Sequence, residues 1–444
     1  MCFHKSFCLG LFFSVLVLGI GCHAVAQEKP INTLSLDSAL RLADENNAEI
    51  VKHGIEKEIT HEEVKEKKEL RLPDIGFNAS YARVSSITEF THGNFGQKKE
   101  THLIPEMYGT VLSASLPVYS GNAINNEISK GKIQDNIAQL RLDKVQKNIH
   151  LQVVAVFLGV YRLTEIEKLI TENIAEEKER LKEVKVLLKN GVVTKNEVLR
   201  AELQLTDREQ ALLINKKDMD IALHELKILL ELPEEEEVSL DLSGLLDVTD
   251  NGRDYTALAK TGNEDIKIAH EESQIAQLDI KIAKAGYYPQ IRLFGNYAYK
   301  YPNYMFFPPD PYPYTFGQVG VEAVFDISRL YKNKTKVAVA KKRAEAARAE
   351  TRIQENTVQE NVFRMHTQYR EILDKFPVTD KAEALALENY RLVKLRYFNQ
   401  LVLITEMIDA DNALLQAKFN KVTARIDAVM KYYETLHAAG IAIH

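Results

Sequence analysis

The feature that most constrains this chain is a sharp break between two very long helical patterns, at residues 187–199. Asn190 and Gly191 supply a left-handed helix end, and Thr194 with Glu197 three residues later matches the capping box that begins a helix. The chain therefore turns back on itself here. The sequence predicts a long helical hairpin with its tip at this break.

The hairpin pattern occurs twice. About 209 residues later, residues 396–408 repeat the apolar and acidic positions, so that Asn190 corresponds to Asn399 and Glu197 to Glu406. An order of helix, strand, strand, helix, helix recurs around both breaks. We expect a signal peptide at 1–26, a first structural repeat at 27–232, an acidic linker at 233–253 and a second repeat at 254–444.

The helices beside the first break are too long for a compact domain. The pattern that follows Ser120-Gly121 runs to Lys189, about 68 residues or roughly 100 Å of helix. One stripe of apolar residues follows it at spacings of three, four and seven, typical of helices packed side by side: Ile166, Ile170, Ile174, Leu181, Val184 and Leu188. The second repeat begins with one helix over 255–285, and Pro377 is expected to interrupt the last long helical region.

The N-terminus has the features of a secretory signal. Lys5 precedes an apolar run at 9–20, and Ala24-Val25-Ala26 has the small residues of a cleavage site. Cleavage after Ala26 would remove all three cysteines and exclude disulfides. A lipoprotein cut before Cys22 is the alternative. No continuous apolar run of membrane-spanning length follows this segment, so insertion into a membrane must use another device.

Four segments alternate with the period of two that a half-buried strand requires. They begin near Ile75, Tyr108, Ile291 and Val319, and the first pair is joined by a polar loop at 85–107. The second loop, at 301–315, is rich in proline, tyrosine and phenylalanine, which favours an aromatic girdle where a membrane barrel meets water. The acidic run at 233–237 is interpreted as a solvated loop.

Polar residues fall on one face of these four strands and apolar residues on the other. The polar set is Asn78, Ser80, Ser113, Ser115, Gln290, Arg292, Asn296, Gln318 and Glu322. This is the pattern of a barrel with lipid outside and water inside, for which roughly eight strands are the fewest that close. Because open sheet edges are not tolerated in lipid, several chains must pool their strands into one ring.

Taken together, these residues resemble the TolC-like outer-membrane efflux proteins over nearly the whole mature chain. The short segments that most resemble the family are Leu72-Pro73 and Tyr288-Pro289 before the strands, and residues 405–410 after the second break. The resemblance implies a mainly helical fold with a small β part. Long helical hairpins would form a periplasmic tunnel, and four strands per chain would contribute to a trimeric 12-strand outer-membrane β-barrel.

The resemblance also implies a function. The protein would be the outer-membrane channel of a tripartite efflux or type I secretion system, reaching into the periplasm. It would act as a passive conduit, without catalysis or cofactor, for substrates delivered by an inner-membrane pump and a periplasmic adaptor (membrane fusion) protein. The alternative is a secreted coiled-coil periplasmic adaptor or scaffold without a barrel, which explains the hairpins but not the two pairs of strands.

Two sets of residues are candidates for function. In TolC-like proteins the hairpin tips dock with the adaptor, which assigns this role to Asn190, Gly191, Val192, Val193, Asn399, Gln400 and Leu401. Glu406 and Asp409 lie three apart at the start of a helix and share one face. The resemblance places such a pair at the narrow periplasmic entrance, whereas simple stabilisation of the positive helix end is the alternative.

Other kinds of site are poorly supported by the sequence. His61-Glu62-Glu63 lacks the second histidine of a zinc helix, and no phosphate-binding glycine loop or nucleophile elbow occurs. His92 and His102 share a loop but lack further metal ligands at suitable spacing, so no metal site is expected. The net charge of −6 argues against a nucleic-acid partner.

Overall fold

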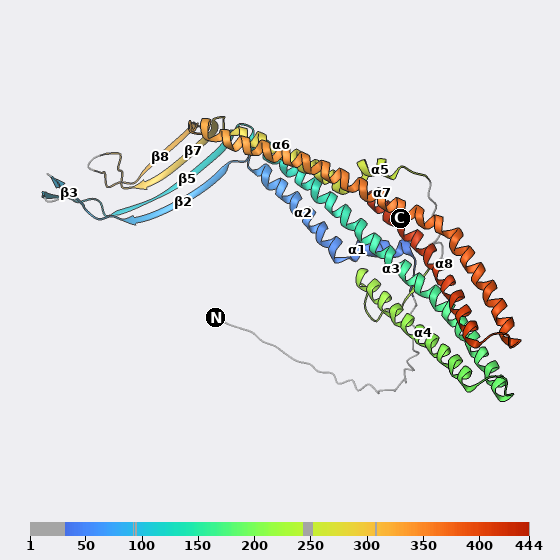
Figure 1. The fold of residues 1–444 in the computed structure, drawn as a ribbon. Helices are drawn as coiled ribbons and strands as arrows, with labels where there is room; N and C mark the ends of the chain where they lie inside the picture. The colour runs from blue at the N-terminus through green and yellow to red at the C-terminus, as the bar shows by residue number, and fades with distance from the viewer. Residues whose placement is uncertain (1–31, 92, 94–95, 243–251, 307–308, 444) are drawn as a thin grey trace, which may run out of the picture.

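The computed structural model describes residues 32–91, 93, 96–242, 252–306 and 309–443. The expected signal peptide and all three cysteines lie outside these residues. Figure 1 shows an elongated molecule, with a β-sheet at one end and the tips of two helical hairpins at the other. The fold therefore separates a strand region from a helical region, as the sequence indicated.

The main sheet contains four antiparallel strands. In spatial order they are β2 (Asp74–Arg83), β5 (Glu106–Tyr119), β7 (Gln290–Tyr301) and β8 (Tyr314–Val324). All three pairings are antiparallel, and β5 pairs with β7 although the two strands come from different repeats. Within the described chain, β2 and β8 each have one edge without a partner strand. The two repeats thus share a single open sheet.

The strand register places the expected polar residues on one face. Asn296 lies opposite Ser113 on one side and Gln318 on the other, and Arg292 lies opposite Glu322, with which it forms an ion pair. This face also carries a few apolar side chains, among them Val111, Phe294 and Phe316. The other face is more uniformly apolar and is exposed in the single chain: Ile75, Phe77, Tyr81, Leu112, Leu293, Tyr297, Val319 and Val321.

Two small β-elements were not expected. The loop at 85–107 contains a hairpin of β3 (Ile87–Thr91) and β4 (Gln97–Thr101), in which threonine and charged residues pair across the strands without a buried face. The acidic linker contains β6 (Val238–Leu240), which pairs in parallel with β1 (Asn32–Leu34). Both elements are too short for their hydrophobic pattern to distinguish them from loops.

Two helices run the length of the helical region. They are α3 (Ala123–Lys189) and α7 (Arg329–Phe398), and each turns back at its tip into a shorter helix, α4 (Lys195–Leu229) and α8 (Ile404–Ala438). Pro377 lies inside α7, so the expected interruption there is wrong. A proline removes one backbone hydrogen bond and bends a helix, but packing against neighbouring helices can keep the helix continuous.

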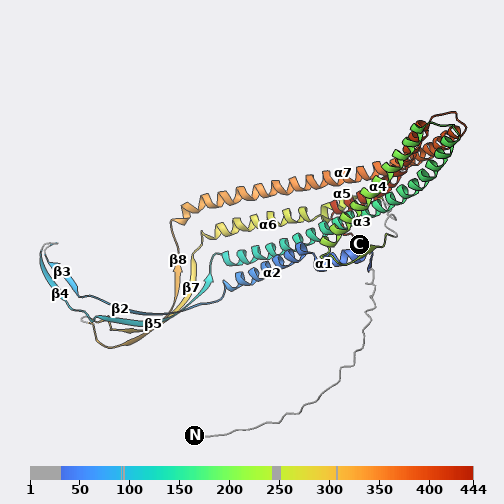
Figure 2. The ribbon, with the colours of Figure 1, turned by 90° about the horizontal axis from the view of Figure 1, so that it is seen from below.

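The helices form a curved layer in which four helices lie side by side at each level. Near the strands, α2 (Ala48–Glu69) packs on α3, α3 on α6 (Glu264–Ala285), and α6 on α7. Towards the tips, α4 packs on α3, α3 on α8, and α8 on α7. Figure 2 shows α2 and α7 at opposite sides of this layer. One lateral edge of the chain is therefore α2 followed by α4, and the other is α7 throughout.

Each repeat contains a helix break that the sequence reading missed. Asn47 separates α1 (Leu36–Asn46) from α2, and Asn263 separates α5 (Tyr255–Gly262) from α6. Both asparagine side chains cap the second helix of the pair with Oδ1 and donate from Nδ2 to the end of a distant helix, at Leu229 O and Ala438 O. Helix 255–285 is therefore two helices, joined by an asparagine that anchors the end of α8.

The largest core lies halfway along the molecule, where α1, α3, α4 and α8 meet. Val153, Val154 and Phe157 of α3 are fully buried in it. This part of α3 includes an 18-residue stretch apolar enough to cross a membrane, which the sequence reading had not expected. A third of this stretch is buried, and those residues pack against other helices in this core.

Candidate channel entrance

The two hairpin tips end at equivalent turns. Asn190 is the C-cap residue of α3, and Gly191 after it adopts a left-handed conformation (φ 72°). Val192 N donates to Leu187 O at 2.9 Å. The second helix ends at Asn399, and Gln400 takes the left-handed position (φ 61°). A glutamine there is strained in a way that glycine is not. The duplicated turn geometry is thus kept although the glycine is not.

The tips differ in which side chains they expose. Val192 and Leu401 occupy the same place in the two turns and both project into solvent, at 40% and 67% exposure. Val193 and Val402, one residue further, are partly buried against a shared apolar core that contains Val184, Val198, Ala201, Tyr397, Ile404 and Met407. The tips therefore pack against each other, and they expose Val192 on the first tip and Leu401 and Leu403 on the second.

The start of α4 departs from the capping box read from the sequence. Thr194 does occupy the N-cap position, but its side chain makes no capping hydrogen bond. The Glu197 carboxylate instead accepts from the Tyr397 hydroxyl at 3.4 Å, which joins α4 to the end of α7. Burial, together with the charge of Glu197, raises the pKa of Tyr397 to about 12.

Glu406 and Asp409 lie on one exposed face of α8, as expected. The residues that follow each of them, Met407 and Ala410, are buried on the opposite face. The N-cap residue of α8 is Leu403, which offers no side-chain acceptor, and only Glu406 lies in the first turn. Stabilisation of the helix end therefore accounts for Glu406 more readily than for Asp409.

A buried cluster of charged side chains lies above the tips and joins the two hairpins. Arg180 of α3 donates to Glu177 Oε1 at 2.6 Å, to Asp411 Oδ1 of α8 at 3.1 Å and to the Tyr390 hydroxyl of α7 at 2.9 Å. Asn173 Nδ2 donates to Asp411 Oδ2 at 3.1 Å. All five side chains are less than a tenth exposed. We call these five residues the hairpin cluster.

The hairpin cluster holds two carboxylates against one guanidinium. Burial raises the pKa of Glu177 to about 7, and the negative charge of Asp411 adds to this, although Arg180 acts in the opposite direction. Burial by itself would lower the pKa of Arg180. The negative charges of Asp411 and Glu177 outweigh this effect and raise the pKa above its ordinary value, so the guanidinium stays charged. Burial also raises the pKa of Tyr390.

Asn412, the residue after Asp411, forms a second polar contact between the hairpins. Asn412 Oδ1 accepts from Gln204 Nε2 of α4 at 2.8 Å and from the Arg208 guanidinium of the same helix. Consecutive residues of α8 are thus held by the two helices of the other hairpin, Asp411 by α3 and Asn412 by α4. The first hairpin is in this way connected to the second by polar contacts as well as by the apolar core at the tips.

Sequence reasoning missed the hairpin cluster because its residues occur in charge-rich helices. The stripe along α3 contains a gap of seven residues between Ile174 and Leu181. Glu177 occupies the place in this gap where the stripe requires an apolar residue, and it is fully buried. Asp411 likewise follows the buried positions Ile404 and Met407 at helical spacing. Polar residues at such positions were the available signal.

The metal and enzyme candidates gain no support from the described residues. His92 lies outside them. His61 instead lies beside Asp135, with Nδ1 and Oδ2 3.4 Å apart. No group of three or more histidine, cysteine, aspartate or glutamate side chains that could hold a metal ion occurs in the described part of the chain.

Comparison with known proteins identifies relatives of part of the sequence and of the whole fold. The family model described as outer membrane efflux protein matches residues 39–230. No curated protein sequence matches the chain. The family model thus covers the first tip and the strands β2 and β5, whereas the second repeat is compared through structure.

Several solved outer-membrane channels share the fold. The Campylobacter jejuni CmeC channel is 15% identical, with 97% of this chain and 93% of that chain covered and a TM-score of 0.74. VceC from Vibrio cholerae is 15% identical over 92% and 97% of the two chains, with a TM-score of 0.75. The open Neisseria gonorrhoeae MtrE channel is 17% identical over 91% and 89%, with a TM-score of 0.74. These likenesses establish the fold of both repeats.

Proposed function

Because this chain belongs to the outer membrane efflux protein family and is an outer-membrane efflux channel with the TolC-like fold, we propose that three copies form a passive conduit whose narrow end receives substrates from an inner-membrane pump. Such channels are transporters and not enzymes, and they extend from the outer membrane into the periplasm. Members of the family form trimers that work with efflux pumps. A periplasmic adaptor would bind the hairpin tips.

The observation that supports the shared conduit is the pair of open edges. Among the described residues, β2 and β8 have no outer partner strand at the two sides of the sheet. The corresponding sides of the helical layer are α2 with α4 on one side and α7 on the other. A ring of three identical copies closes only if unlike edges meet, with β8 of one copy beside β2 of the next. In lipid such a ring satisfies every strand edge, which an isolated chain cannot do.

The helical edges carry unpartnered apolar stripes that fit this arrangement. Five aliphatic residues of α4 lie on one face and are exposed in the single chain: Leu199, Leu203, Ile214, Ile221 and Ile228. A matching stripe on α7 faces away from α6 and α8: Ile353, Phe363, Val378, Leu385 and Leu392. Exposed apolar stripes of this length are rare on monomers. In the ring, the α4 stripe of one copy packs against the α7 stripe of the next.

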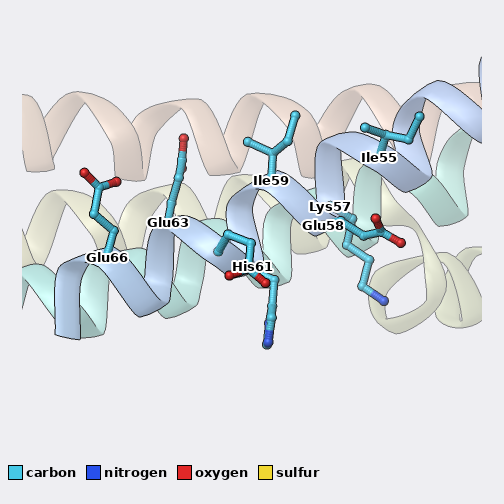
Figure 3. Close-up of a pocket in the computed structure, with 8 residues that line it drawn as sticks. Ile55, Lys57, Glu58, Ile59, His61, Glu63 and Glu66 are labelled. Atoms are coloured by element: carbon cyan, nitrogen blue, oxygen red, sulfur yellow. The ribbon is translucent and has the colours of Figure 1, made fainter. Parts of the chain in front are cut away.

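Charge supports the same pairing near the strands. Figure 3 shows α2 from the side of a groove of about 790 Å³. Its charged lining is one lysine and four glutamates: Lys57, Glu58, Glu62, Glu63 and Glu66. The facing edge of the next copy is the first part of α7, residues 329–355, which has nine lysines and arginines against three glutamates. An acidic edge beside a basic one favours this contact and disfavours like edges meeting.

The trimer contact can be tested on α4. Replacing Leu203 and Ile221 with glutamate should convert the detergent-extracted complex from three copies to single chains. Each burial is worth about 1.5–3 kcal/mol, and two buried charges per interface would add a penalty. Native mass spectrometry gives the copy number. Glu209→Gln, an exposed change on another side of α4, is the control and should remain trimeric; a trimeric double variant would contradict the ring.

We propose that Glu406 and Asp409 line the periplasmic entrance. Both side chains are exposed on the tip region of α8, and among the described residues neither forms an ion pair within the chain. Asp409 lies beyond the first turn of α8, where a carboxylate no longer stabilises the positive end of the helix. A lining role therefore explains it better than capping does. A ring of these carboxylates around the trimer axis would attract cations and repel anions.

Removal of this ring should change ion selectivity more than stability. We expect Glu406→Ala with Asp409→Ala to bring the reversal potential of single channels in asymmetric salt close to zero, with a melting temperature near that of the parent. Asp218→Ala, which removes an exposed carboxylate of α4, should leave the selectivity unchanged. Unaltered cation preference together with a lower melting temperature would identify the pair as helix-capping residues.

A further inference from the structure

Glu177 of the hairpin cluster is incompletely bonded. Its Oε1 accepts from Arg180, but Oε2 is buried and has no hydrogen-bond partner in the part of the chain that the structure describes. Asn173, one turn earlier on α3, also has a buried oxygen without a partner, and its amide orientation is set because Nδ2 donates to Asp411. Two buried acceptors therefore lack a donor on the same face of one helix.

A single proton is the simplest group that supplies this donor. Asp411 accepts hydrogen bonds from both Arg180 and Asn173, one on each carboxylate oxygen. Glu177 has one bonded oxygen only, and it shares the same guanidinium. Arg208 of α4 also acts on Glu177 but donates no hydrogen bond to it. Of the two carboxylates, the less well bonded takes the proton because burial disfavours a negative charge that lacks its full set of hydrogen bonds.

We propose that Glu177 holds a proton in the resting entrance, and that loss of this proton loosens the contact between hairpin α3–α4 and hairpin α7–α8, so that the channel opens more readily at alkaline pH. The inference rests on the proposed conduit and adds a control to it. Ionised Glu177 would repel Asp411 on α8 while the two compete for Arg180. The raised pKa of Glu177 agrees with this assignment.

The charged and titratable groups around Glu177 come from all four tip helices. They are Arg180 of α3, Arg208 of α4, Tyr390 of α7 and Asp411 of α8. Arginine and tyrosine keep their protonation state near neutral pH, and the pKa of Tyr390 is raised still further. Glu177 is therefore the group of this set whose charge changes around pH 7.

The sign of the effect on stability follows from the same shift. In the unfolded chain the Glu177 side chain ionises near its ordinary value of 4.5, whereas in the folded hairpins it does so at about 7. Between these values the folded state binds more protons, so folding stability falls as pH rises through this window and changes no further above it.

Channel recordings across pH test the proposal. Wild-type trimers in planar lipid bilayers, from about pH 5.5 to about pH 8.5, should show an open probability that rises with a midpoint near the Glu177 pKa. Glu177→Gln keeps the shape and supplies a permanent donor, so it should stay in the low-pH behaviour throughout. The control Glu172→Gln changes an exposed carboxylate of the same helix and should titrate as wild type. Identical titration of Glu177→Gln and wild type would overturn the proposal.

A second measurement does not require conduction. Between about pH 5.5 and about pH 7.5 the urea midpoint of unfolding should fall more steeply for wild type and Glu172→Gln than for Glu177→Gln. His437, whose pKa is lowered by burial, contributes in the opposite direction in all three proteins. Equal slopes in all three would show that Glu177 binds no extra proton. A trimer that conducts at no pH would contradict the proposed conduit, while this midpoint still decides the question of the proton.

Discussion

Replacing Arg180 with methionine is expected to lower the free energy of unfolding of the helical region by about 3–5 kcal/mol. The change leaves Asp411 and Glu177 buried without their shared cation, and it leaves the Tyr390 hydroxyl without its donor. Removing one partner from a buried ionic group costs far more than removing an exposed pair, because the remaining charge cannot reach water. Urea unfolding followed by circular dichroism measures the loss.

An exposed pair on the same helix provides the matched control. Lys182 lies 2.6 Å from Glu179, and both side chains are mostly exposed. Lys182→Met should therefore cost less than about 1 kcal/mol. Adding Glu177→Met and Asp411→Leu to Arg180→Met should recover much of the stability, since no buried charge then remains. If Arg180→Met were no worse than Lys182→Met, the cluster would not connect the hairpins energetically.

The second large effect concerns the tips. Changing Val192 and Leu401 together to aspartate should abolish export in cells while the trimer still forms and conducts ions. Both side chains are exposed and lie at equivalent places in the two turns, so the change removes apolar contact with an adaptor at little cost to folding. Export is measured as the accumulation of a pump substrate, and assembly by native mass spectrometry.

The neighbouring tip residues show why the choice of positions matters. Val193 packs into the core shared by the two hairpins, and Gly191 has a left-handed backbone that a side chain would strain. A charge at either place would disturb the fold as well as a docking surface. As a control, Lys195→Asp adds negative charge beside the first tip without removing an aliphatic contact, and it should export far better. Normal export by the double variant would place docking elsewhere.

Long elements could be predicted from the sequence because their patterns repeat many times. The helices α3 and α7 and the four long strands each present enough residues for a period to be recognised, and Gly191 marks a turn by a backbone requirement of its own. Short elements present too few residues for a period, so the segments of β3, β4 and β6 are predicted as loop or linker and β1 is not predicted at all. The breaks at Asn47 and Asn263 were missed although their Oδ1 caps are local, because each asparagine's Nδ2 bond reaches a helix end far away in the sequence.

The candidate site was only partly accessible for a similar reason. Glu406 and Asp409 were found from their spacing and their place after a tip, which are local properties. The hairpin cluster depends on which helix lies opposite Glu177, and that is decided by tertiary packing. At Pro377 the local signal was clear but misleading. Proline disfavours a helix interior, yet α7 continues through this residue because it packs against neighbouring helices.

The two unlike edges of the chain also determine how many copies complete the assembly. In a head-to-tail contact each added subunit is turned by the same angle relative to the last, and the structure closes only when a whole number of these steps makes a full circle. An angle slightly too small or an axial shift would give an open, growing filament instead. In the proposed trimer, the angle between the α2–α4 edge and the α7 edge of one chain would therefore set the bore of the pore, before any second copy is present.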